Sequence, residues 1–184
     1  LHNARKILEK KNDYHFIEGE QYPGVDWPEL SRKMSHRHLG AGSDGIILVL
    51  PSDEHDFKMR IFNADGSEAE TCGNGIRCFG KYVFERGMIE KTAFVIDTLA
   101  GPNAVVLNVD AGEVRSVRSN MGLPRFDRED IPMTGPGGPV IEEALALEDQ
   151  TVAVTCANIG NPHAVVFVED AAAVDLAAVG PRSL

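Results

Sequence analysis

Cys72 has a sequence context in which a thiol can do acid–base chemistry. It is followed by Gly73-Asn74-Gly75, after which apolar residues recur at three- and four-residue spacing, as in a helix. The first N–H groups of a helix lack acceptors and favour negative charge, and so the thiolate form of a cysteine placed there. Gly73 and Gly75 let the backbone approach a ligand closely, and their N–H groups can hold a carboxylate. A thiolate beside a bound carboxylate is suited to removing the proton from the adjacent carbon.

A structural role for the cysteines is the alternative. A cysteine near a helix start is more often a small buried residue than a catalyst. Cys78, on the expected helix, and Cys156, inside an apolar segment, are interpreted as core residues. A disulfide between Cys72 and Cys78 is geometrically unfavourable within one helical segment. A metal site from Cys72, Cys78 and His163 would lack the closely spaced cysteine pairs typical of zinc, so we expect no metal.

A second polar cluster contains Asn161 and His163. It spans residues 158–163, between two apolar segments that are expected to pair as strands, so both side chains can face a ligand. Histidine titrates near neutral pH, which suits His163 to assist as an acid or a base. The alternative is a tight Gly-Asn-Pro turn with an exposed histidine, which the spacing alone favours slightly.

The composition limits the class of protein. The 184 residues carry a formal net charge of −10, which argues against nucleic acid or an anionic membrane as a partner. The longest apolar runs, residues 45–51 and 164–168, are far shorter than the roughly 20 residues of a membrane-spanning helix. Three cysteines are too few for a disulfide framework and indicate a reducing, cytoplasmic setting. Phosphate-loop, dinucleotide-binding, serine-hydrolase and pyridoxal-lysine motifs are absent, so we expect no cofactor.

The segments that must position these residues are many short strands and a few helices. Asp26 as a cap and Pro28 in the first turn predict a helix over residues 26–34. The periodicity after Gly75 predicts a second helix that stops at Gly87. Apolar or alternating segments between turn residues predict strands, and with them an α+β fold rich in antiparallel sheet. The expected strands are residues 14–18, 45–50, 57–63, 68–70, 93–97, 104–109, 114–118, 151–157 and 164–168.

Seven short motifs follow one another along most of the chain. They are NDY at residues 12–14, RHLGAGSDG at 37–45, NADGS at 63–67, CGNGIRC at 72–78, TLAG at 98–101, MGLPRF at 121–126 and GNPH at 160–163. In this order they resemble the diaminopimelate epimerases, a family of pyridoxal-independent amino-acid racemases. One such motif would be a weak signal, whereas seven in the family's order are specific.

The resemblance implies a fold and a site. The fold would be α+β with two pseudo-symmetric domains, each a strand-rich barrel around a central helix. Residues 1–115 would form the first domain, and residues 116–184 would form the start of an incomplete second domain. Cys72 would be one of two proton-transfer thiols, with His163 near the reacting centre. The substrate-binding residues would be Asn12, Asn63, Gly73, Asn74 and Asn161.

The implied activity is interconversion of LL- and meso-2,6-diaminopimelate, a small molecule, in lysine and peptidoglycan precursor synthesis. Inversion requires loss of a proton from one face and gain of a proton on the opposite face, which two flanking thiols can do without a cofactor. A homodimer would also follow from the resemblance. Proline racemase-like relatives usually carry histidine where Asn74 stands, so residues 72–75 favour diaminopimelate.

Two departures from the family pattern shape the remaining expectations. Residues 8–11 replace a Gly-x-Gly element before Asn12, and the segment with the second thiol does not occur before Leu184. We therefore expect a fragment or truncated chain that folds its first domain poorly and does not invert substrate by itself. The alternatives are a catalytically inactive binding or scaffold chain of the same fold, and a thiol-based redox or metal-binding protein.

Overall fold

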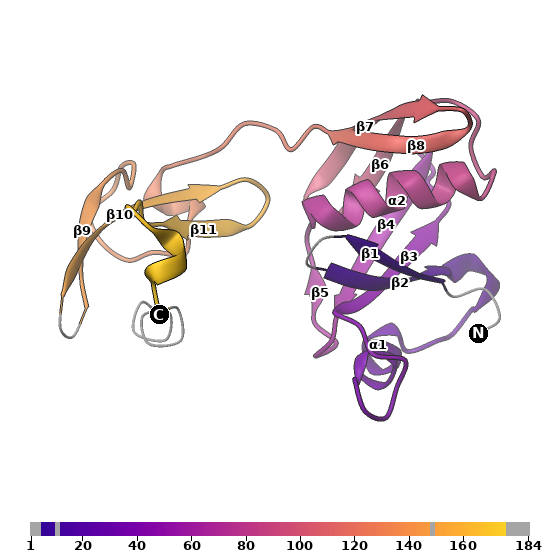
Figure 1. Cartoon of the computed structure of the whole chain (residues 1–184), viewed down its shortest axis with the longest axis horizontal. Helices are drawn as coiled ribbons and strands as arrows, with labels where there is room; N and C mark the ends of the chain where they lie inside the picture. Colours follow the sequence, from indigo (N-terminus) through magenta and orange to yellow (C-terminus); the bar gives the residue numbers. More distant parts are fainter. Residues whose placement is uncertain (1–4, 10–11, 148–149, 176–184) are drawn as a thin grey trace. The chain divides into compact units, whose positions relative to one another are not determined.

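The computed structural model describes residues 5–9, 12–147 and 150–175 (Figure 1). Contacts within the chain divide it into two compact units, Leu1–Met121 and Gly122–Leu184. Each unit has its own sheet. Within the described residues, no helix has the length and apolar character needed to cross a membrane.

The first unit is built on one large mixed sheet. Its strands lie in the order β1-β2-β3-β4-β6-β7-β8, and β5 pairs with β4. β2 and β3 are parallel, as are β4 and β6, whereas the other neighbours are antiparallel. The elements are β1 (Arg5–Glu9), β2 (Asn12–Glu18), the 3-10 helix η1 (Gly19–Gln21), α1 (Trp27–Ser35), β3 (Gly45–Leu50), β4 (Phe57–Asn63), β5 (Glu68–Ala69), α2 (Gly73–Glu85), β6 (Ala93–Thr98), β7 (Gly101–Asp110) and β8 (Glu113–Ser119).

The two helices lie on opposite faces of this sheet. Parallel neighbours need a crossover connection; α1 lies in the one from β2 to β3, and α2 in the one from β4 to β6. Both crossovers step the same way across the sheet, but β4 and β6 run opposite to β2 and β3. Right-handed crossovers then put the helices on opposite faces. The two hydrophobic cores are consistent with this placement, because Ile46 and Leu48 of β3 pack with α1 whereas Ile47 and Val49, on the other face of the strand, pack with α2.

The sheet curls around α2. The helix contacts β1 and β2 at one edge of the sheet and β7 and β8 at the other edge. Its residues Ile76, Phe79 and Val83 are fully buried, as the periodicity predicts. Gly80 permits the close approach of β7 and β8, because a Cβ there would lie 3.1–3.3 Å from their side chains. The helix ends just before Gly87, whose φ of 66° suits glycine.

α1 begins as the sequence predicts. The carboxylate of Asp26 accepts a hydrogen bond from the backbone N–H of Glu29 at 3.0 Å, which caps the helix. The hydroxyl of the fully buried Ser31 donates to the carbonyl oxygen of Asn63 at 2.7 Å. α1 is thereby fixed to the end of β4 that carries Asn63.

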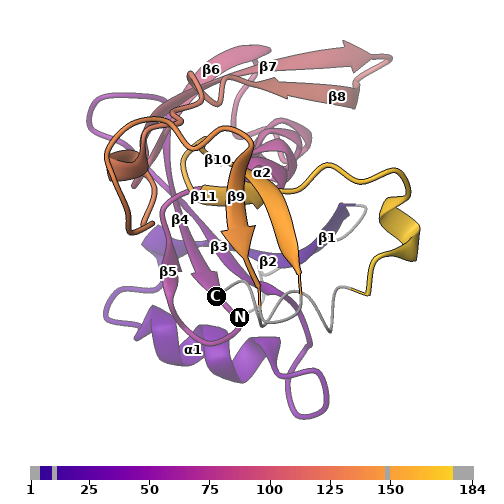
Figure 2. The same cartoon turned by 90° about the vertical axis from the view of Figure 1, so that its left-hand side faces the viewer.

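The second unit contains a small antiparallel sheet in the order β11-β10-β9, and Figure 2 shows β9 and β10 side by side. Its hydrophobic core consists of Ile131, Val140, Val154 and Cys156. Its elements are the 3-10 helix η2 (Arg128–Asp130), β9 (Glu143–Ala146), β10 (Thr151–Asn158), β11 (Pro162–Val165) and the 3-10 helix η3 (Ala171–Ala173).

Buried Arg128 holds the glycine- and proline-rich loop of the second unit. Its guanidinium donates to the carbonyl oxygens of Thr134 and Pro136 at 2.8 and 2.7 Å. It also donates to the carboxylate of Glu143 on β9. The loop over residues 132–139 is therefore held by a side chain whose buried charge is paired and hydrogen-bonded.

Some elements differ from the sequence-based expectations. The sequence does not predict β1 or β9, because β1 is mixed and basic and β9 alternates over only four residues. β11 starts earlier than the expected strand over residues 164–168, because Asn158 pairs with Pro162 across a turn in which Gly160 has a φ of 107°. His163 is thus a strand residue, which corrects its expected place in a loop. β8 crosses positions 115 and 116, where the domain boundary was expected, and stays paired with β7 on both sides of them.

Candidate active site

Cys72 caps the N-terminus of α2. Its Sγ accepts a hydrogen bond from the N–H of Gly75 at 3.4 Å and lies 3.5 Å from the hydroxyl of Tyr14. Cys72 is partly exposed, whereas Cys78 and Cys156 are buried as expected, and all three thiols are free. The partly exposed thiol therefore lies at the helix start that the sequence predicts.

The glycines after Cys72 have different surroundings. A Cβ on Gly75 would lie 3.0 Å from Cδ1 of Ile47 and 3.4 Å from Cβ of Cys72, so a side chain there would press on Ile47. A Cβ on Gly73 would make only ordinary contacts, at 3.6 Å or more. Helix geometry leaves the N–H groups of Gly73 and Asn74 without acceptors inside the helix, and such groups can bind an anion.

A chain of polar side chains with a fixed direction runs from α2 to the sheet. Arg77 donates to Oδ1 of Asn74, and Nδ2 of Asn74 donates to Oδ1 of Asn12 at 2.7 Å. Nδ2 of Asn12 in turn donates to Oδ2 of Asp44 at 3.1 Å. A guanidinium can only donate and an ionised carboxylate can only accept. The two charged ends therefore fix which way both amides point.

Asp44 anchors this chain to the sheet. Its Oδ2 also accepts from the backbone N–H of Asp13 at 3.0 Å, and its Oδ1 accepts from Arg37 at 2.8 Å. Arg37 reaches the carboxylate of Asp13 as well, at 3.2 Å. The first residues of β2 and the residue before β3 are thus held together, which fixes Asn12 at the start of its strand. Residues 10 and 11, part of the departure from the family pattern, lie outside the described residues.

Tyr14 connects the thiol to the sheet. It is aligned with Gly45 on β3, which is aligned with Asn63 on β4. Because neighbouring strands lie about 4.8 Å apart, the Cα atoms of Tyr14 and Asn63 are about 10 Å apart. The amide of Asn63 donates to Oγ of Ser67 at 3.0 Å. Burial, and then the hydrogen bond with Cys72, raises the pKa of Tyr14 above its ordinary value, so its hydroxyl stays protonated.

Asn161 and His163 belong to the second unit. Asn161 lies in the turn between β10 and β11, and Nε2 of His163 lies 3.0 Å from Oδ1 of Asn161. Both side chains are exposed. The expected site residues thus form two groups, namely Asn12, Cys72, Gly73 and Asn74 with Asn63 two strands away in the first unit, and Asn161 with His163 in the second.

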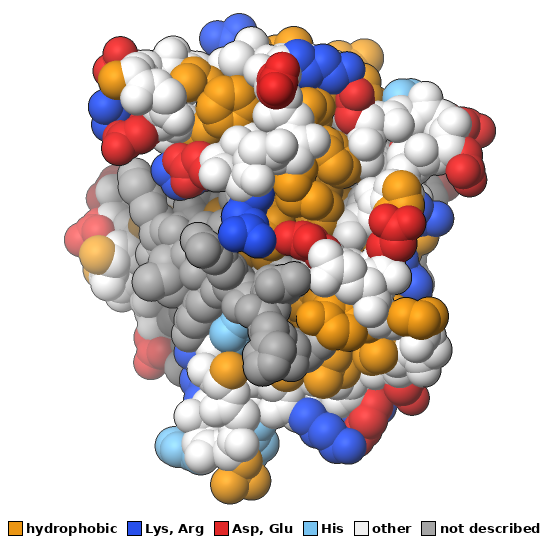
Figure 3. Space-filling view, turned by 90° about the vertical axis from the view of Figure 1, so that its right-hand side faces the viewer, with side chains coloured by type: hydrophobic (Ala, Val, Ile, Leu, Met, Phe, Trp, Pro, Cys, Tyr) orange, Lys and Arg blue, Asp and Glu red, His pale blue; other side chains and the backbone are white. Residues whose placement is uncertain are grey.

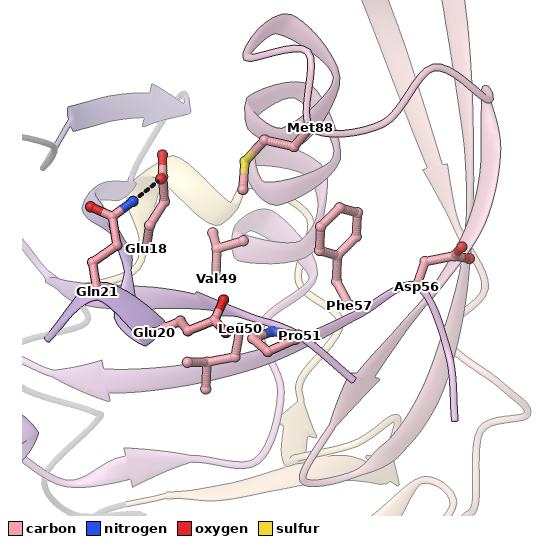
Figure 4. Close-up of a pocket in the computed structure, with 9 residues that line it drawn as sticks. All are labelled: Glu18, Glu20, Gln21, Val49, Leu50, Pro51, Asp56, Phe57 and Met88. Carbon is pink, nitrogen blue, oxygen red and sulfur yellow. Dashed lines mark hydrogen bonds between the residues drawn. The ribbon is translucent and has the colours of Figure 1, made fainter. Parts of the chain in front are cut away.

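A cavity of about 230 Å³ in the first unit lies away from these residues. Figure 4 shows Val49, Phe57 and Met88 around it, with Glu18 and Asp56 among its acidic members. Glu18 is at the opposite end of β2 from Asn12, so no expected site residue lines this cavity. The face of the molecule in Figure 3 exposes hydrophobic side chains among acidic and basic ones. Among the described residues, no group of three or more His, Cys, Asp or Glu side chains is arranged to hold a metal ion.

The sequence model described as diaminopimelate epimerase matches residues 10–126, which include Cys72 and the whole polar chain beside it. This protein chain belongs to the diaminopimelate epimerase family. It is 47% identical over 172 residues to the diaminopimelate epimerase of Moorella thermoacetica. It is 42% identical over 170 residues to that of one strain of Methanococcus maripaludis. Each comparison covers 92% of this chain and 61% of the relative, so the chain spans about three fifths of the length of these curated relatives.

Solved structures of more distant proteins share the fold. The crystal structure of a probable proline racemase from Agrobacterium radiobacter K84, with bound carbonate, has a TM-score of 0.66 at 18% identity and covers 96% of this chain and 52% of that chain. A hydroxyproline epimerase from Agrobacterium vitis has a TM-score of 0.62 at 19% identity and covers 89% of this chain and 50% of that chain. These matches confirm the expected α+β fold class, and at such identities they concern the fold alone.

Sequence reasoning missed three residues of this region: Tyr14, Asp44 and Arg77. Two of them carry a local signal. Alternate residues of a strand share a face, so a ligand-facing Asn12 puts Tyr14 on the same side. Arg77 follows Asn74 by three residues, which puts both on one face of a helix. Asp44 has no such signal, because its contact with Asn12 spans 32 positions and depends on how β2 and β3 pair.

Proposed function

We propose that the chain forms part of an epimerase acting on 2,6-diaminopimelate, with Cys72 as the base that removes the α-proton. The observation that carries the proposal is a partly exposed thiol that caps α2 and accepts a hydrogen bond from Gly75. It lies next to helix N–H groups that have no acceptors within the helix. Family membership supports the choice of substrate, since the relatives from Moorella thermoacetica and Methanococcus maripaludis are named diaminopimelate epimerases.

The proposed chemistry begins with the substrate α-carboxylate bound by the N–H groups of Gly73 and Asn74. The positive end of the helix dipole favours both this carboxylate and the thiolate of Cys72. The thiolate takes the α-proton and becomes a thiol, while the electron pair of the broken C–H bond spreads into the carboxylate. Donors that already point at the carboxylate stabilise the charge that develops on it.

The amides of Asn12 and Asn74 are proposed to bind the polar groups of the substrate. Their hydrogen bond of 2.7 Å supports this, because a small ligand can reach two amides that touch each other. Asn63 is proposed to contact the substrate from β4. In the second unit, Asn161 is proposed to bind substrate, and His163 to assist the proton transfer.

Inversion also needs a proton donor on the opposite face of the α-carbon. Cys78 and Cys156 are buried in the cores of their own units, with 6% and 4% of their surface exposed. Neither is suited to reach a ligand at the start of α2. The second thiol is therefore proposed to come from sequence outside these 184 residues, and the 184-residue chain is proposed to exchange the α-proton without inverting the centre.

The test is α-proton exchange of LL-diaminopimelate in heavy water, followed by proton NMR. The 184-residue chain is compared with Cys72→Ala and with Cys156→Ala, a control that removes a buried thiol of the second unit. Exchange should require Cys72, persist in Cys156→Ala and leave the configuration unchanged, because one thiol returns deuterium to the face it deprotonated. Exchange that persists in Cys72→Ala, or inversion by this chain at ordinary turnover, would contradict the two-thiol proposal.

A chimera extends this test to the complete reaction. It continues from Leu184 with the remaining sequence of the Moorella thermoacetica relative, of which the chain covers 61%. The chimera should convert the LL to the meso form, and Cys72→Ala should slow its α-proton exchange by about a thousandfold, the size expected for loss of a positioned base. A folded chimera that exchanged the α-proton of proline but not that of diaminopimelate would overturn the proposed substrate.

A further inference from the structure

Tyr14 has a buried hydroxyl directed at the candidate base. Its side chain is 5% exposed and belongs to the core around α2. Among the described residues, the hydrogen-bond partner of its hydroxyl is Sγ of Cys72, at 3.5 Å. A buried phenol group normally needs such a partner. The pair joins β2 to the start of α2 across 58 positions of the sequence.

We propose that Tyr14 is a positioning residue for Cys72. The hydroxyl of Tyr14 holds the sulfur of Cys72 at the N-terminus of α2 and donates a hydrogen bond to its thiolate. The inference rests on the proposed function of Cys72 as a base. The N–H of Gly75 reaches the sulfur from α2 and the hydroxyl of Tyr14 reaches it from β2, so donors from two elements restrict its position. Hydrogen bonds to the charged form favour that form, here the thiolate.

A hydroxyl suits a sulfur that must alternate between two protonation states. A backbone N–H can only donate, whereas a hydroxyl donates to the thiolate and can accept from the thiol. Burial, followed by the hydrogen bond with Cys72, holds the pKa of Tyr14 above its ordinary value, so Tyr14 does not give up its own proton. Asp44, before β3, and Cys78, on α2, act in the same direction, because negative charge on either disfavours a tyrosinate. Arg77 is the nearby cation on α2, and it donates to Asn74.

Tyr82 provides a matched control. It is 3% exposed, packs in the same core and donates its hydroxyl to Oε1 of Glu18 at 3.1 Å. It lies ten positions after Cys72, which is about 15 Å along the helix. Tyr14→Phe and Tyr82→Phe each remove one buried hydroxyl and keep the ring. They differ in whether the lost partner is the thiol or a distant carboxylate.

The thiolate of Cys72 is measured by the rate of alkylation with iodoacetamide as a function of pH. Trypsin releases residues 61–77 as one peptide, in which Cys72 is the only cysteine, so mass spectrometry isolates its reaction. In Tyr14→Phe the midpoint of the pH profile should rise by about one unit, which is about a tenfold smaller thiolate fraction below the midpoint. In Tyr82→Phe the profile should match that of the unmodified chain. An unshifted profile in a folded Tyr14→Phe chain, or an equal shift in Tyr82→Phe, overturns the inference.

α-Proton exchange in the same variants separates this inference from the proposed function. Tyr14→Phe should slow exchange about tenfold near neutral pH, with recovery above the new midpoint, because the thiolate returns there. A loss of packing alone would not recover with pH. If exchange is lost in Cys72→Ala but unchanged in Tyr14→Phe, the inference about Tyr14 is overturned and the proposed function of Cys72 is supported. A shifted alkylation profile without Cys72-dependent exchange supports the inference and overturns the function.

A second variant covers the case in which Tyr14→Phe fails to fold. Incorporation of 3-fluorotyrosine at position 14 keeps the ring and the hydroxyl and makes the phenol a stronger donor. The alkylation midpoint of Cys72 should then move to lower pH. A midpoint that stays in place or rises in that chain overturns the inference.

Discussion

Replacing Asp44 by asparagine should destabilise the first unit, because it disturbs the anchor of the polar chain. Oδ2 of Asp44 accepts from both Asn12 and the N–H of Asp13, and Oδ1 accepts from Arg37. Asparagine keeps an oxygen at only one of these two positions. If the oxygen faces Asn12 and Asp13, the new NH₂ group faces a guanidinium. In the reverse orientation, the NH₂ group faces two N–H donors.

The first orientation costs less and sets the size of the effect. The Arg37 side chain is 58% exposed and already contacts Asp13, so its contact with Asp44 adds little. The remaining loss is the charge of the acceptor in two hydrogen bonds. A bond to a charged group contributes about 1 kcal/mol more than a neutral one, so Asp44→Asn should lower the free energy of unfolding by about 2 kcal/mol.

Urea denaturation followed by tryptophan fluorescence measures this change in the first unit alone. Trp27, the single tryptophan of the sequence, is the first residue of α1. With a urea dependence of roughly 2 kcal/mol per molar, the midpoint should fall by about 1 M. The control is Asp110→Asn, because Asp110 also pairs with an arginine, Arg115 at 3.5 Å, but is 73% exposed. Its midpoint should not move.

An unchanged midpoint in Asp44→Asn, or an equal fall in Asp110→Asn, would refute the reasoning. A double-mutant cycle sharpens the result. Asp44→Asn and Asn12→Ser should be coupled by about 1 kcal/mol, because each removes part of the same hydrogen bond. If the two changes in unfolding free energy are additive, Asp44 does not act through the polar chain.

Three further predictions concern other parts of the chain. The hydroxyl of Ser52, and then the ring of His55, hold the pKa of Asp97 below its ordinary value of 3.8. A depressed carboxyl pKa stabilises the fold above the unfolded value, and this is lost as pH falls through the folded value, so Ser52→Ala should lower the urea midpoint at about pH 6 more than at about pH 3. Arg128→Leu should cost the second unit about 3 kcal/mol by leaving Glu143 and two carbonyl groups unpaired, seen as faster hydrogen exchange over residues 128–158 and unchanged exchange over residues 12–119. Asn74→Asp should lower the unfolding free energy by about 1 kcal/mol, because a carboxylate cannot donate to Oδ1 of Asn12, although an acidic side chain suits a helix N-terminus beside Arg77. In the NMR assay the same variant should slow α-proton exchange by at least about tenfold, because its charge repels the substrate carboxylate.

The parts of the fold that the sequence predicts are those with a local cause. The cap of α1 depends on Asp26 and Glu29, which are three residues apart. α2 follows from its apolar spacing and from Gly87 after its end. β3 follows from a continuous apolar run, which fits a strand covered by a helix on each face. Each of these signals lies within one element and the residues directly beside it.

The parts that the sequence does not predict depend on distant pairing. The bond between Asn74 and Asn12 spans 62 positions, and the contact of Tyr14 with Cys72 spans 58. Residue types at these positions indicate a site but not which atoms meet. The apolar run over residues 164–168 predicts a strand, but β11 spans Pro162–Val165, because an apolar run does not by itself set where strand pairing starts and ends. In the structure Phe167 is 82% exposed, and the pairing of β10 and β11 is set by the turn at Gly160.

Asn12 and Asn74 can each bind a ligand while the hydrogen bonds of the polar chain stay in place. An amide has two N–H donors and an oxygen with two lone pairs. Asn74 uses its oxygen for Arg77 and one N–H for Asn12; Asn12 uses its oxygen for Asn74 and one N–H for Asp44. Among the described residues, each amide therefore keeps one donor, which suits a carboxylate, and one lone pair, which suits an ammonium group. An amino acid presents both groups together, so two oriented amides match it.

The same hydrogen bonds therefore affect both the stability of the polar chain and its ability to bind a ligand. Neither amide can turn over without setting a donor against the donor of Arg77 or an oxygen against the carboxylate of Asp44. The spare donor and lone pair thus keep fixed directions before a ligand arrives, which lowers the cost of ordering them on binding. Asp44→Asn removes the end that can only accept and allows the amides to reverse. It should therefore weaken diaminopimelate binding as well as the fold, and a variant that lost only stability would mean that the amides are oriented by packing instead.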